Sequence, residues 1–379
     1  MQVRHSIELI ILSYLKHVRR PKGVYPTLLK LLFNMYSKQN MSVRWDNEVS
    51  EPFKARNGVK QGGVLSPVLF TLYLDVLMDM LKSSGFGCYV GNIFAGAVAY
   101  ADDIALLAPS KFSLNQLLKQ CSIFADLYQF DFNPNKSEFM IHTHTHTELQ
   151  DEIQFMNKMI KSQTSCSHLG NIVGNNQCEK RVNAAVADFN SKTNVLLSTF
   201  RNVNYDVKFK LFRTISMALY GSQLWDMSSK YVERFYVAWR KAIRRIFSLP
   251  YRTHCRFLHL ITRELPIDVQ LHLRTLNMFK SFATSNNTIV KLCSNLAMNG
   301  SGSPIANSIN FIAFKYHISK EIVVNLLKPT NVRALLTGAC TESVEDRQIA
   351  SFVREVLASD RSFLCQDELS TILTYLCCN

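Results

Sequence analysis

Two adjacent carboxylates, Asp102 and Asp103, interrupt an apolar, strand-like run from Ala97 to Leu107. Burying two neighbouring charges in a strand is costly, because each charge must leave water and each repels the other. A divalent cation offsets both costs, and Mg²⁺ in particular binds carboxylate oxygens while sharing its other positions with water and phosphate groups. The pair therefore predicts a metal site for phosphate chemistry. A water-exposed hairpin tip is the alternative structure for the same residues.

A glycine-rich segment upstream of this pair has features that favour contact with a phosphate-bearing ligand. It contains Gln61, Gly62 and Gly63 and continues to Ser66 and Pro67. Glycine allows a ligand to approach the backbone closely, and the start of a helix offers N–H groups that the helix itself does not use. Ser66 is a good N-cap and Pro67 fits the first helical position, so a helix should begin there. Taken alone, the segment is most simply a loop before a capped helix.

The composition is that of a basic globular protein. The 379 residues carry a formal net charge of +14, and they are 47% hydrophobic and 19% charged, which excludes a disordered chain. A chain this basic often binds polyanions, most commonly nucleic acid, and a basic protein without such a partner is the alternative. The ten cysteines include no Cys-x-x-Cys pair, and no stretch is long and apolar enough for a membrane span. We therefore expect a soluble intracellular protein, nuclear or cytoplasmic, with no membrane partner.

Local patterns predict the elements that must position these residues. The first part of the chain should contain a helix from Pro26, a hairpin over 42–53 turning at Asp46-Asn47, a largely buried helix from Ser66 that ends before Gly85, and strands over 88–93 and 97–107. From about 176 to 260 apolar residues recur at helical spacing, as at Val232, Phe235 and Trp239. That spacing predicts an all-helical segment.

The predicted helical segment is also strongly basic. Between Arg201 and Arg256 there are twelve Lys or Arg residues and only three acids. Four of these bases form two i, i+4 pairs on the side of the predicted helix opposite its apolar face. They are Arg240, Lys241, Arg244 and Arg245. Such a stripe predicts salt-sensitive contacts with a nucleic-acid backbone.

The glycine-rich segment and the carboxylate pair together resemble the reverse transcriptase family, in particular its non-LTR (LINE-type) retrotransposon branch. The motifs are Arg-Asn-Gly-Val-Lys-Gln-Gly-Gly-Val-Leu-Ser-Pro over 56–67 and Tyr-Ala-Asp-Asp over 100–103. Weaker agreement is found in Phe-Asn-Pro-Asn-Lys-Ser over 132–137, in His168-Leu169-Gly170, which resembles the primer-grip motif, and in Leu-Tyr-Gly over 219–221, which resembles the thumb region. The resemblance covers residues 20 to 260 well.

That resemblance implies an RNA-directed DNA polymerase, a nucleotidyltransferase that adds dNTPs to a primer 3′-hydroxyl on an RNA template. Asp102 would coordinate the catalytic metals with Asp103 in support, and Lys136 would protonate the leaving pyrophosphate. The implied cofactor is Mg²⁺, with Mn²⁺ as an alternative, acting as a two-metal clamp on the displacement. The incoming nucleotide and template would contact Gln61, Gly62, Gly63 and Tyr100, and the primer would contact His168, Leu169 and Gly170.

The family pattern is incomplete in this sequence. The earlier palm aspartate of the family, typically in Phe-x-x-Ala-Phe-Asp, has no match, because no aspartate precedes Asp46 and Glu8 lacks that context. Asp102 and Asp103 alone would leave two metals short of ligands. We therefore expect an N-terminally truncated domain with little or no polymerase activity by itself. The alternative function is a non-catalytic nucleic-acid-binding remnant of a retrotransposon.

The expected fold class is α+β. A polymerase palm, with a small antiparallel sheet backed by helices, would be followed by an all-helical thumb and a C-terminal helical region. The expected domains are partial fingers and palm over 1–175, a basic helical thumb or connection over 176–260, a linker over 299–308, and a helical tail of unassigned role over 309–379. The sequence gives no indication of the oligomeric state.

Overall fold

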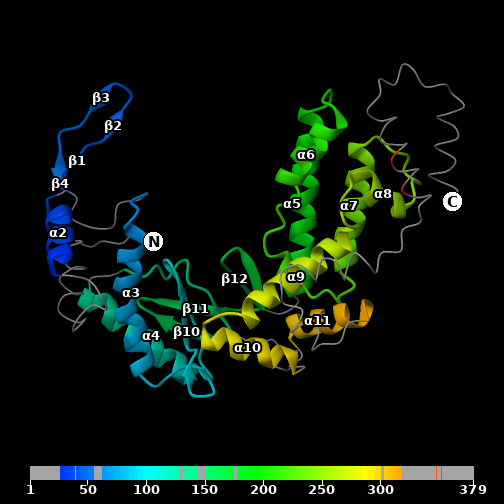
Figure 1. Ribbon diagram of the computed structural model, residues 1–379. Helices are drawn as coiled ribbons and strands as arrows, with labels where there is room; N and C mark the ends of the chain where they lie inside the picture. Colours follow the sequence, from blue (N-terminus) through cyan, green and yellow to red (C-terminus); the bar gives the residue numbers. More distant parts are fainter. Residues whose placement is uncertain are drawn as a thin grey trace, which may run out of the picture. The chain divides into compact units, whose positions relative to one another are not determined.

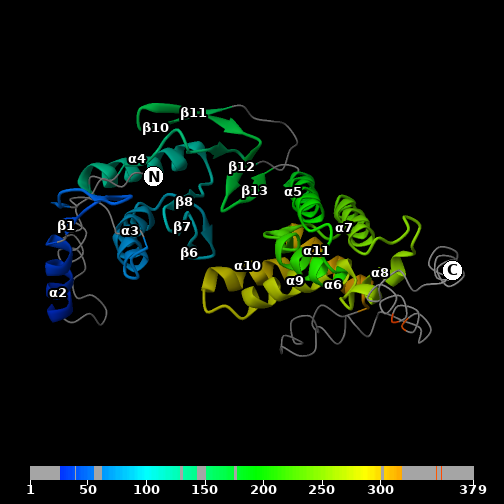
Figure 2. The same ribbon diagram turned by 90° about the horizontal axis from the view of Figure 1, so that it is seen from above.

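A computed structural model describes residues 26–38, 40–54, 62–128, 131–142, 151–174, 177–299 and 303–317, together with residues 347 and 351. The chain divides into two compact units, Met1–Leu169 and Gly170–Asn379. Each unit has its own hydrophobic core. Figures 1 and 2 show the helices and strands of both units.

The first unit combines helices with short strands. Its helices are α2 (Pro26–Ser37), α3 (Ser66–Ser83) and α4 (Lys111–Tyr128). Its strands are β1 (Asn40–Met41), β2 (Arg44–Trp45), β3 (Glu48–Val49), β4 (Phe53–Lys54), β5 (Tyr89–Val90), β6 (Ile93–Phe94), β7 (Ala97–Tyr100), β8 (Asp103–Leu106), β9 (Phe139–Met140), β10 (Glu152–Phe155), β11 (Lys158–Gln163) and β12 (Ser165–His168). In the described residues these strands form several small sheets and not one continuous sheet.

The sheets of this unit are mostly antiparallel, as the sequence predicted. The exception is the three-stranded sheet, in which β11 pairs antiparallel with β10 and parallel with β9. The β10–β11 hairpin causes this arrangement, because it returns the chain to the direction of β9. The prediction of a purely antiparallel sheet was therefore wrong for the β9–β11 pair.

One core joins α3, α4 and the three-stranded sheet. Leu77 of α3 and Phe124 of α4 are fully buried, and Ile160 of β11 packs in the same cluster. The ring of Tyr73 meets Phe124 edge to face at 5.5 Å, and its hydroxyl donates to the carbonyl of Tyr128 at 2.9 Å. Burial raises the pKa of Tyr73, so this hydroxyl stays a donor. The core fixes the position of the strands that follow α3.

Two local predictions were wrong in detail. Leu65 occupies the N-cap of α3 and makes no side-chain cap hydrogen bond, so Ser66 is the first residue of the helix and not its cap. Residues 88–93 do not form one strand, because Gly91, with φ of +59°, turns the chain between β5 and β6. A glycine at positive φ ends a strand that hydrophobicity alone would continue.

The hairpin predicted over 42–53 is confirmed. Trp45 of β2 pairs with Glu48 of β3 around the Asp46-Asn47 turn, in which Asp46 has a φ of +50°. The run from 97 to 107 is likewise broken at 100–103 into β7 and β8.

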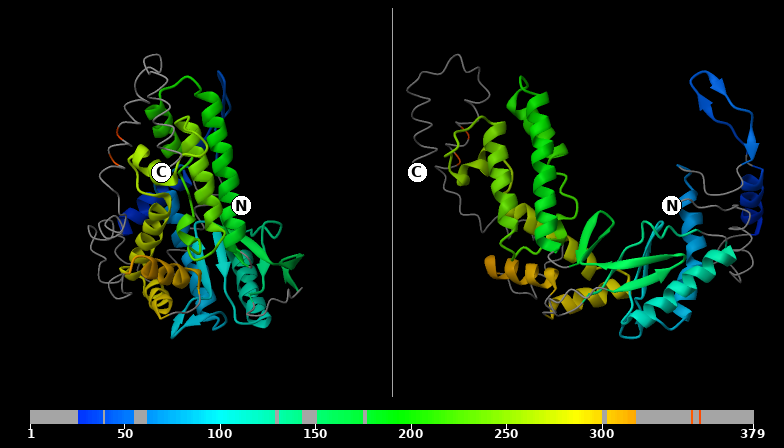
Figure 3. Two further views of the ribbon diagram at one scale, coloured as in Figure 1. Left: turned by 90° about the vertical axis from the view of Figure 1, so that its right-hand side faces the viewer. Right: turned by 180° about the vertical axis from the view of Figure 1, so that it is seen from behind.

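The second unit begins with a strand and is otherwise helical in its described residues. It contains β13 (Asn171–Gly174), α5 (Gln177–Thr199), α6 (Tyr205–Ile215), the short 3₁₀ helix η1 (Ser222–Leu224), α7 (Val232–Ile246), α8 (Cys255–Thr262), α9 (Ile267–Ala283), α10 (Thr288–Met298) and α11 (Pro304–Lys315). Helices α5 and α7 lie side by side (Figures 1 and 3). Their facing aromatic rings, Phe189 and Phe235, have centroids 5.1 Å apart.

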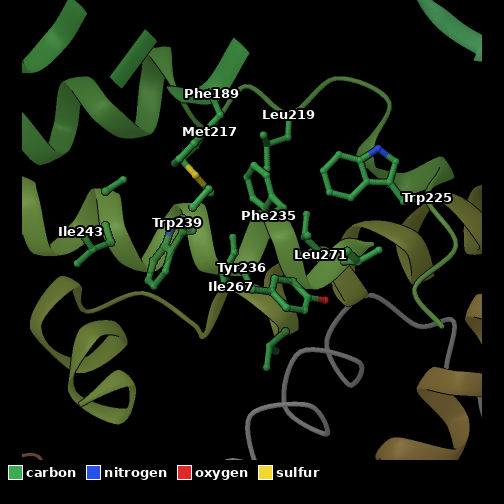
Figure 4. Packing of buried hydrophobic residues seen from close by; sticks show 14 of the residues in the cluster. Phe189, Met217, Leu219, Trp225, Phe235, Tyr236, Trp239, Ile243, Ile267 and Leu271 are labelled. Carbon is green, nitrogen blue, oxygen red and sulfur yellow. The ribbon is translucent and has the colours of Figure 1, made fainter. Parts of the chain in front are cut away.

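The core of this unit extends beyond the predicted boundary at residue 260. Figure 4 shows Phe189, Phe235, Ile267 and Leu271 among the buried residues of one cluster, and Ile312 of α11 belongs to the same cluster. Helices α9 and α11 are thus part of one packed body with α5 and α7. The prediction of a separate helical segment that ends at residue 260 was wrong, because periodicity within α7 does not reveal which later helices pack on α7.

The predicted linker over 299–308 is wrong in its second half. Helix α11 begins at Pro304, and the side chain of Ser303 caps it by accepting from the N–H of Ala306 at 3.2 Å. Most of the predicted tail lies outside the described residues, apart from the end of α11 and the short stretch to residue 317. Within the part of the chain that is described, no helix is both long enough and apolar enough to cross a membrane.

Candidate functional site

Asp102 and Asp103 lie at the tip of the β7–β8 hairpin. Tyr100 pairs with Asp103 across the hairpin, so Ala101 and Asp102 form its two-residue turn. Ala101 has a φ of +50°, as the turns that suit such hairpins require. Both carboxylates and the Tyr100 ring are exposed, and below the tip Ile104 packs against the core of the first unit. The core therefore anchors a hairpin whose carboxylates face water.

The exposure of the carboxylates corrects the argument made from the sequence. A near-buried strand would have forced both charges out of water, whereas at this tip water solvates them and the fold does not need a cation to tolerate them. The tip is still an open position where carboxylate oxygens can bind a metal ion shared with phosphate. Among the described residues, no group of three or more His, Cys, Asp or Glu side chains is arranged to hold a metal. In that part of the chain, Asp102 and Asp103 have no third acid beside them.

The glycine-rich segment leads into α3. Gln61 lies outside the described residues, whereas Gly62 is exposed with φ of +81° and Gly63 is half-buried. The carbonyl of Gly63 accepts from the N–H of Ser66 at 3.1 Å. Among the described residues, and apart from its chain neighbours, no heavy atom lies within 4 Å of the place that a Cβ on Gly62 would occupy. The backbone at Gly62 is therefore accessible to a ligand.

Lys136 is presented by a tight turn. The side-chain oxygen of Asn133 accepts from the N–H of Asn135 at 3.0 Å. The backbone carbonyl of Asn133 accepts from the N–H of Lys136 at 3.1 Å and from the hydroxyl of Ser137 at 3.0 Å. Lys158 of β11 donates to the side chain of Asn135 at 2.9 Å and ties the turn to the three-stranded sheet. The ammonium of Lys136 is exposed on this fixed turn.

His168, Leu169 and Gly170 form the turn at the end of β12. Leu169 has a φ of +48° and Gly170 a φ of +72°, the pair of positive values that a type I′ turn requires. His168 and Leu169 are half-buried, and Gly170 is exposed. The turn falls where the two units divide.

The four bases of the predicted stripe on α7 have different surroundings. Arg240 forms an ion pair with Glu233 at 2.8 Å. Arg244 is half-buried, and its Nε and Nη2 donate to the carbonyl of Thr253 at 3.1 and 2.7 Å. Arg245 is exposed and donates to the side chain of Asn194 on α5 at 2.8 Å, and Lys241 is exposed. Lys241 and Arg245 therefore face solvent, whereas Arg244 stabilises the fold.

Two further arginines, which the sequence did not single out, organise the loop between α6 and α7. Arg181 of α5 donates to the carbonyls of Ile172 and Leu224, and Arg274 of α9 donates to the carbonyls of Met217 and Leu219. The signal for Arg274 was available, because a charge interrupts the buried apolar positions of α9. Its partners lie far back in the sequence and could not be inferred.

A comparison with protein families finds a match for the first unit. Residues 5–173 match the family model described as "Reverse transcriptase (RNA-dependent DNA polymerase)". The matched stretch contains the glycine turn, the carboxylate hairpin, the Lys136 turn and the 168–170 turn. This part of the chain is therefore a reverse transcriptase domain, whose family generally uses divalent metal ions.

Two relatives show which branch of the family it resembles. Over 116 residues the chain is 36% identical to "Retrovirus-related Pol polyprotein from type-2 retrotransposable element R2DM" of Drosophila melanogaster, covering 31% of this chain and 10% of that protein. Over 83 residues it is 39% identical to "Retrovirus-related Pol polyprotein from type-1 retrotransposable element R2" of Popillia japonica, covering 22% of this chain and 12% of that protein. The chain thus matches about a tenth of each relative's length. The domain is of the non-LTR retrotransposon type.

Proposed function

We propose that the β7–β8 hairpin is the metal-binding part of an RNA-directed DNA polymerase, which adds a dNTP to a primer 3′-hydroxyl on an RNA template. The observation that carries the proposal is the solvent-facing Asp102–Asp103 tip inside the stretch that matches the reverse transcriptase family. In this assignment the first unit is the palm, and the helical second unit is the thumb that grips the primer–template duplex. The substrates would be dNTPs and a DNA primer on RNA.

The two carboxylates fit a divalent cation. Mg²⁺ in nucleotide enzymes is held by one or two carboxylates, with waters and substrate phosphates in its other positions, and an exposed turn leaves room for both. Mn²⁺ accepts the same oxygen ligands. When bound, such ions stabilise the attacking and leaving oxygens of an in-line displacement. Asp102 would be the principal ligand, and Asp103 would support it.

The remaining residues have positioning and charge roles in this proposal. Gly62 and Gly63 would let the incoming nucleotide approach the backbone, and Tyr100 would contact the nucleotide or template beside the carboxylates. Lys136, fixed on its turn, would transfer a proton to the leaving pyrophosphate. The protein thus acts by placing reactants and stabilising charge, and no covalent intermediate is required.

Two carboxylates supply few protein ligands for two metals, so we expect little nucleotide incorporation from this chain alone. The second candidate function is non-catalytic binding of nucleic acid. The exposed Lys241 and Arg245 on α7 and the excess of bases around them support it. Both functions predict duplex binding that weakens as salt rises, and they differ in metal binding at the hairpin.

The test measures metal binding and primer extension on the same proteins. Mn²⁺ bound in the presence of primer, RNA template and dNTP is followed by electron paramagnetic resonance for the wild-type chain and for Asp102→Asn. Asp126→Asn, an exposed acid on α4, is the matched control. Mn²⁺ binding that Asp102→Asn loses and Asp126→Asn retains supports the proposal. Primer extension that the wild-type chain performs and Asp102→Asn loses would in addition show a working enzyme. Duplex binding with no difference in Mn²⁺ between the variants would leave only the non-catalytic function.

A further inference from the structure

Tyr220 is a surface residue with an unusually well-fixed backbone. Its side chain is 73% exposed, although its neighbours Leu219 and Gly221 are buried. Single exposed aromatic residues are common and need no explanation by themselves. What distinguishes Tyr220 is the set of buried groups that hold the loop on either side of it.

Two half-buried guanidinium groups hold this loop. On the N-terminal side, Arg274 donates from Nη2 to the carbonyl of Met217 at 3.1 Å and from Nη1 to that of Leu219 at 3.3 Å. On the C-terminal side, Arg181 donates from Nη1 to the carbonyl of Leu224 at 3.2 Å. Burial lowers the pKa of both arginines, which reflects the cost of taking each charge out of water. Charge-assisted hydrogen bonds to carbonyls offset that cost.

Two glycines complete the support. Gly221 has a φ of +77°, and a Cβ at this position would lie 2.0 Å from Oδ1 of Asn171, so any other residue is strained and displaces the Asn171 side chain. On the other side, a Cβ on Gly170 would lie 3.4 Å from Cε1 of Tyr220. The ring therefore rests close to the Gly170 backbone while most of its surface faces solvent. An aromatic ring on a rigid support loses little entropy when a flat ligand packs on it.

We infer that Tyr220 is a stacking platform for a nucleobase of the bound nucleic acid. This inference rests on the proposed function and deepens it. Tyr220 lies in the segment between Arg201 and Arg256, where bases outnumber acids twelve to three, so an anionic chain is favoured over a protein partner. Charged groups would hold phosphates, and the tyrosine ring would hold a base face, which every base offers regardless of sequence. The base can come from the DNA primer or from the RNA template.

The first experiment compares the affinity of full-length variants for a fluorescent primer–template with a recessed end. Stacking contributes about 1–3 kcal/mol per base, so Tyr220→Ala should bind roughly 5- to 150-fold more weakly. Tyr220→Phe and Tyr220→Trp should keep the affinity, because each retains a ring. Tyr251→Ala is the matched control, since Tyr251 is 78% exposed in the same unit. The salt dependence should not change in Tyr220→Ala, because no charge is removed.

The second experiment identifies the strand. 5-Iodouracil is placed in the primer of one duplex and in the template of another, and photo-cross-links to Tyr220 are mapped by mass spectrometry. A cross-link from one strand supports the platform and identifies its ligand. Unchanged affinity in Tyr220→Ala, an equal loss in Tyr251→Ala, or cross-links from neither strand would overturn the inference and leave the proposed function standing. A wild-type chain that binds no duplex even at low salt would overturn both.

Discussion

At the scale of single residues, the loop that carries Tyr220 depends on Gly221, which has no side chain to meet Asn171. Replacing Gly221 by alanine would place a Cβ 2.0 Å from Oδ1 of Asn171 in a backbone with φ of +77°. A non-glycine residue at such a φ costs on the order of 1 kcal/mol, and the steric conflict adds to it. We therefore expect Gly221→Ala to lower the free energy of unfolding by roughly 2–4 kcal/mol in urea denaturation.

A second substitution separates the two causes. Asn171→Ala removes the atoms that the new Cβ would meet, so adding it to Gly221→Ala should recover the steric part of the loss and leave the part due to φ. The double-mutant cycle gives the coupling energy directly. Additive effects of the two substitutions would show that the Asn171 contact is not responsible.

A buried histidine makes the stability of the second unit depend on pH. His272 of α9 is fully buried, and its Nδ1 lies 2.9 Å from the hydroxyl of Tyr316. In the described part of the chain, its Nε2 has no hydrogen-bond partner. Burial, and then the charge of Lys315, lower the pKa of His272 to about 4, whereas Asp268 acts in the opposite direction. The folded protein therefore holds this imidazole neutral.

The sign of the pH effect follows from that lowered pKa. Below the ordinary histidine pKa of about 6.5, the unfolded chain takes up a proton that the folded chain refuses, so the folded state loses stability as pH falls from there towards 4. The loss should reach about 3 kcal/mol, since one pKa unit corresponds to about 1.4 kcal/mol. Urea denaturation at pH 7, 6, 5 and 4 covers roughly this window, and it should show the decline in wild type and a shallower one in His272→Gln. Equal slopes would rule out His272 as the cause.

At the scale of elements, helix α7 combines a structural face with a solvent face. Arg244→Met should destabilise the fold by about 1–3 kcal/mol, because it leaves the carbonyl of Thr253 without its two charged donors. Lys241→Gln should barely change stability but should lower the slope of log affinity against log salt by about one unit for duplex binding. Chemical denaturation and salt titration distinguish the two roles. A reduced salt slope in Arg244→Met with unchanged stability would contradict this division.

The same helix shows how far sequence reasoning could reach. Spacing correctly predicted α7 and its buried residues, such as Phe235 and Trp239, because a 3.6-residue period is a local property. It could not separate Arg244 from Lys241, because the carbonyl that Arg244 contacts belongs to the loop at Thr253, beyond the end of the helix. Periodicity identifies a face of a helix, and tertiary structure decides what meets that face.

The carboxylate hairpin shows a different limit. A break at 100–103 was expected, and Tyr100 pairs with Asp103 around it, as in the water-exposed hairpin tip that was the alternative interpretation. The expected burial was wrong, because apolar neighbours in sequence alternate between the two faces of a strand and need not cover the tip. Partial burial of Ile104 and exposure of Asp103 are both consistent with one short hairpin anchored at its base.

At the scale of the whole molecule, the residues that the proposed function uses are divided between two units with separate cores. The first contains the carboxylate hairpin and the Lys136 turn, and the second contains the basic helix α7 and Tyr220. Leu77 is fully buried in the core of the first unit, and Phe235 is fully buried in that of the second. Because none of the described residues belongs to both clusters, loss of one core need not unfold the other.

We therefore expect two separable unfolding transitions, and the tryptophans allow them to be distinguished. Trp225 and Trp239 are buried in the second unit, whereas Trp45 of the first is 78% exposed, so fluorescence reports mainly on the second unit and circular dichroism on both. Phe235→Ala and Leu77→Ala should each cost about 2–5 kcal/mol. Phe235→Ala should shift the fluorescence midpoint in urea to lower concentration. Leu77→Ala should leave that midpoint unchanged and shift only part of the dichroism signal. A fluorescence midpoint that falls equally in both variants would mean that the two cores unfold as one.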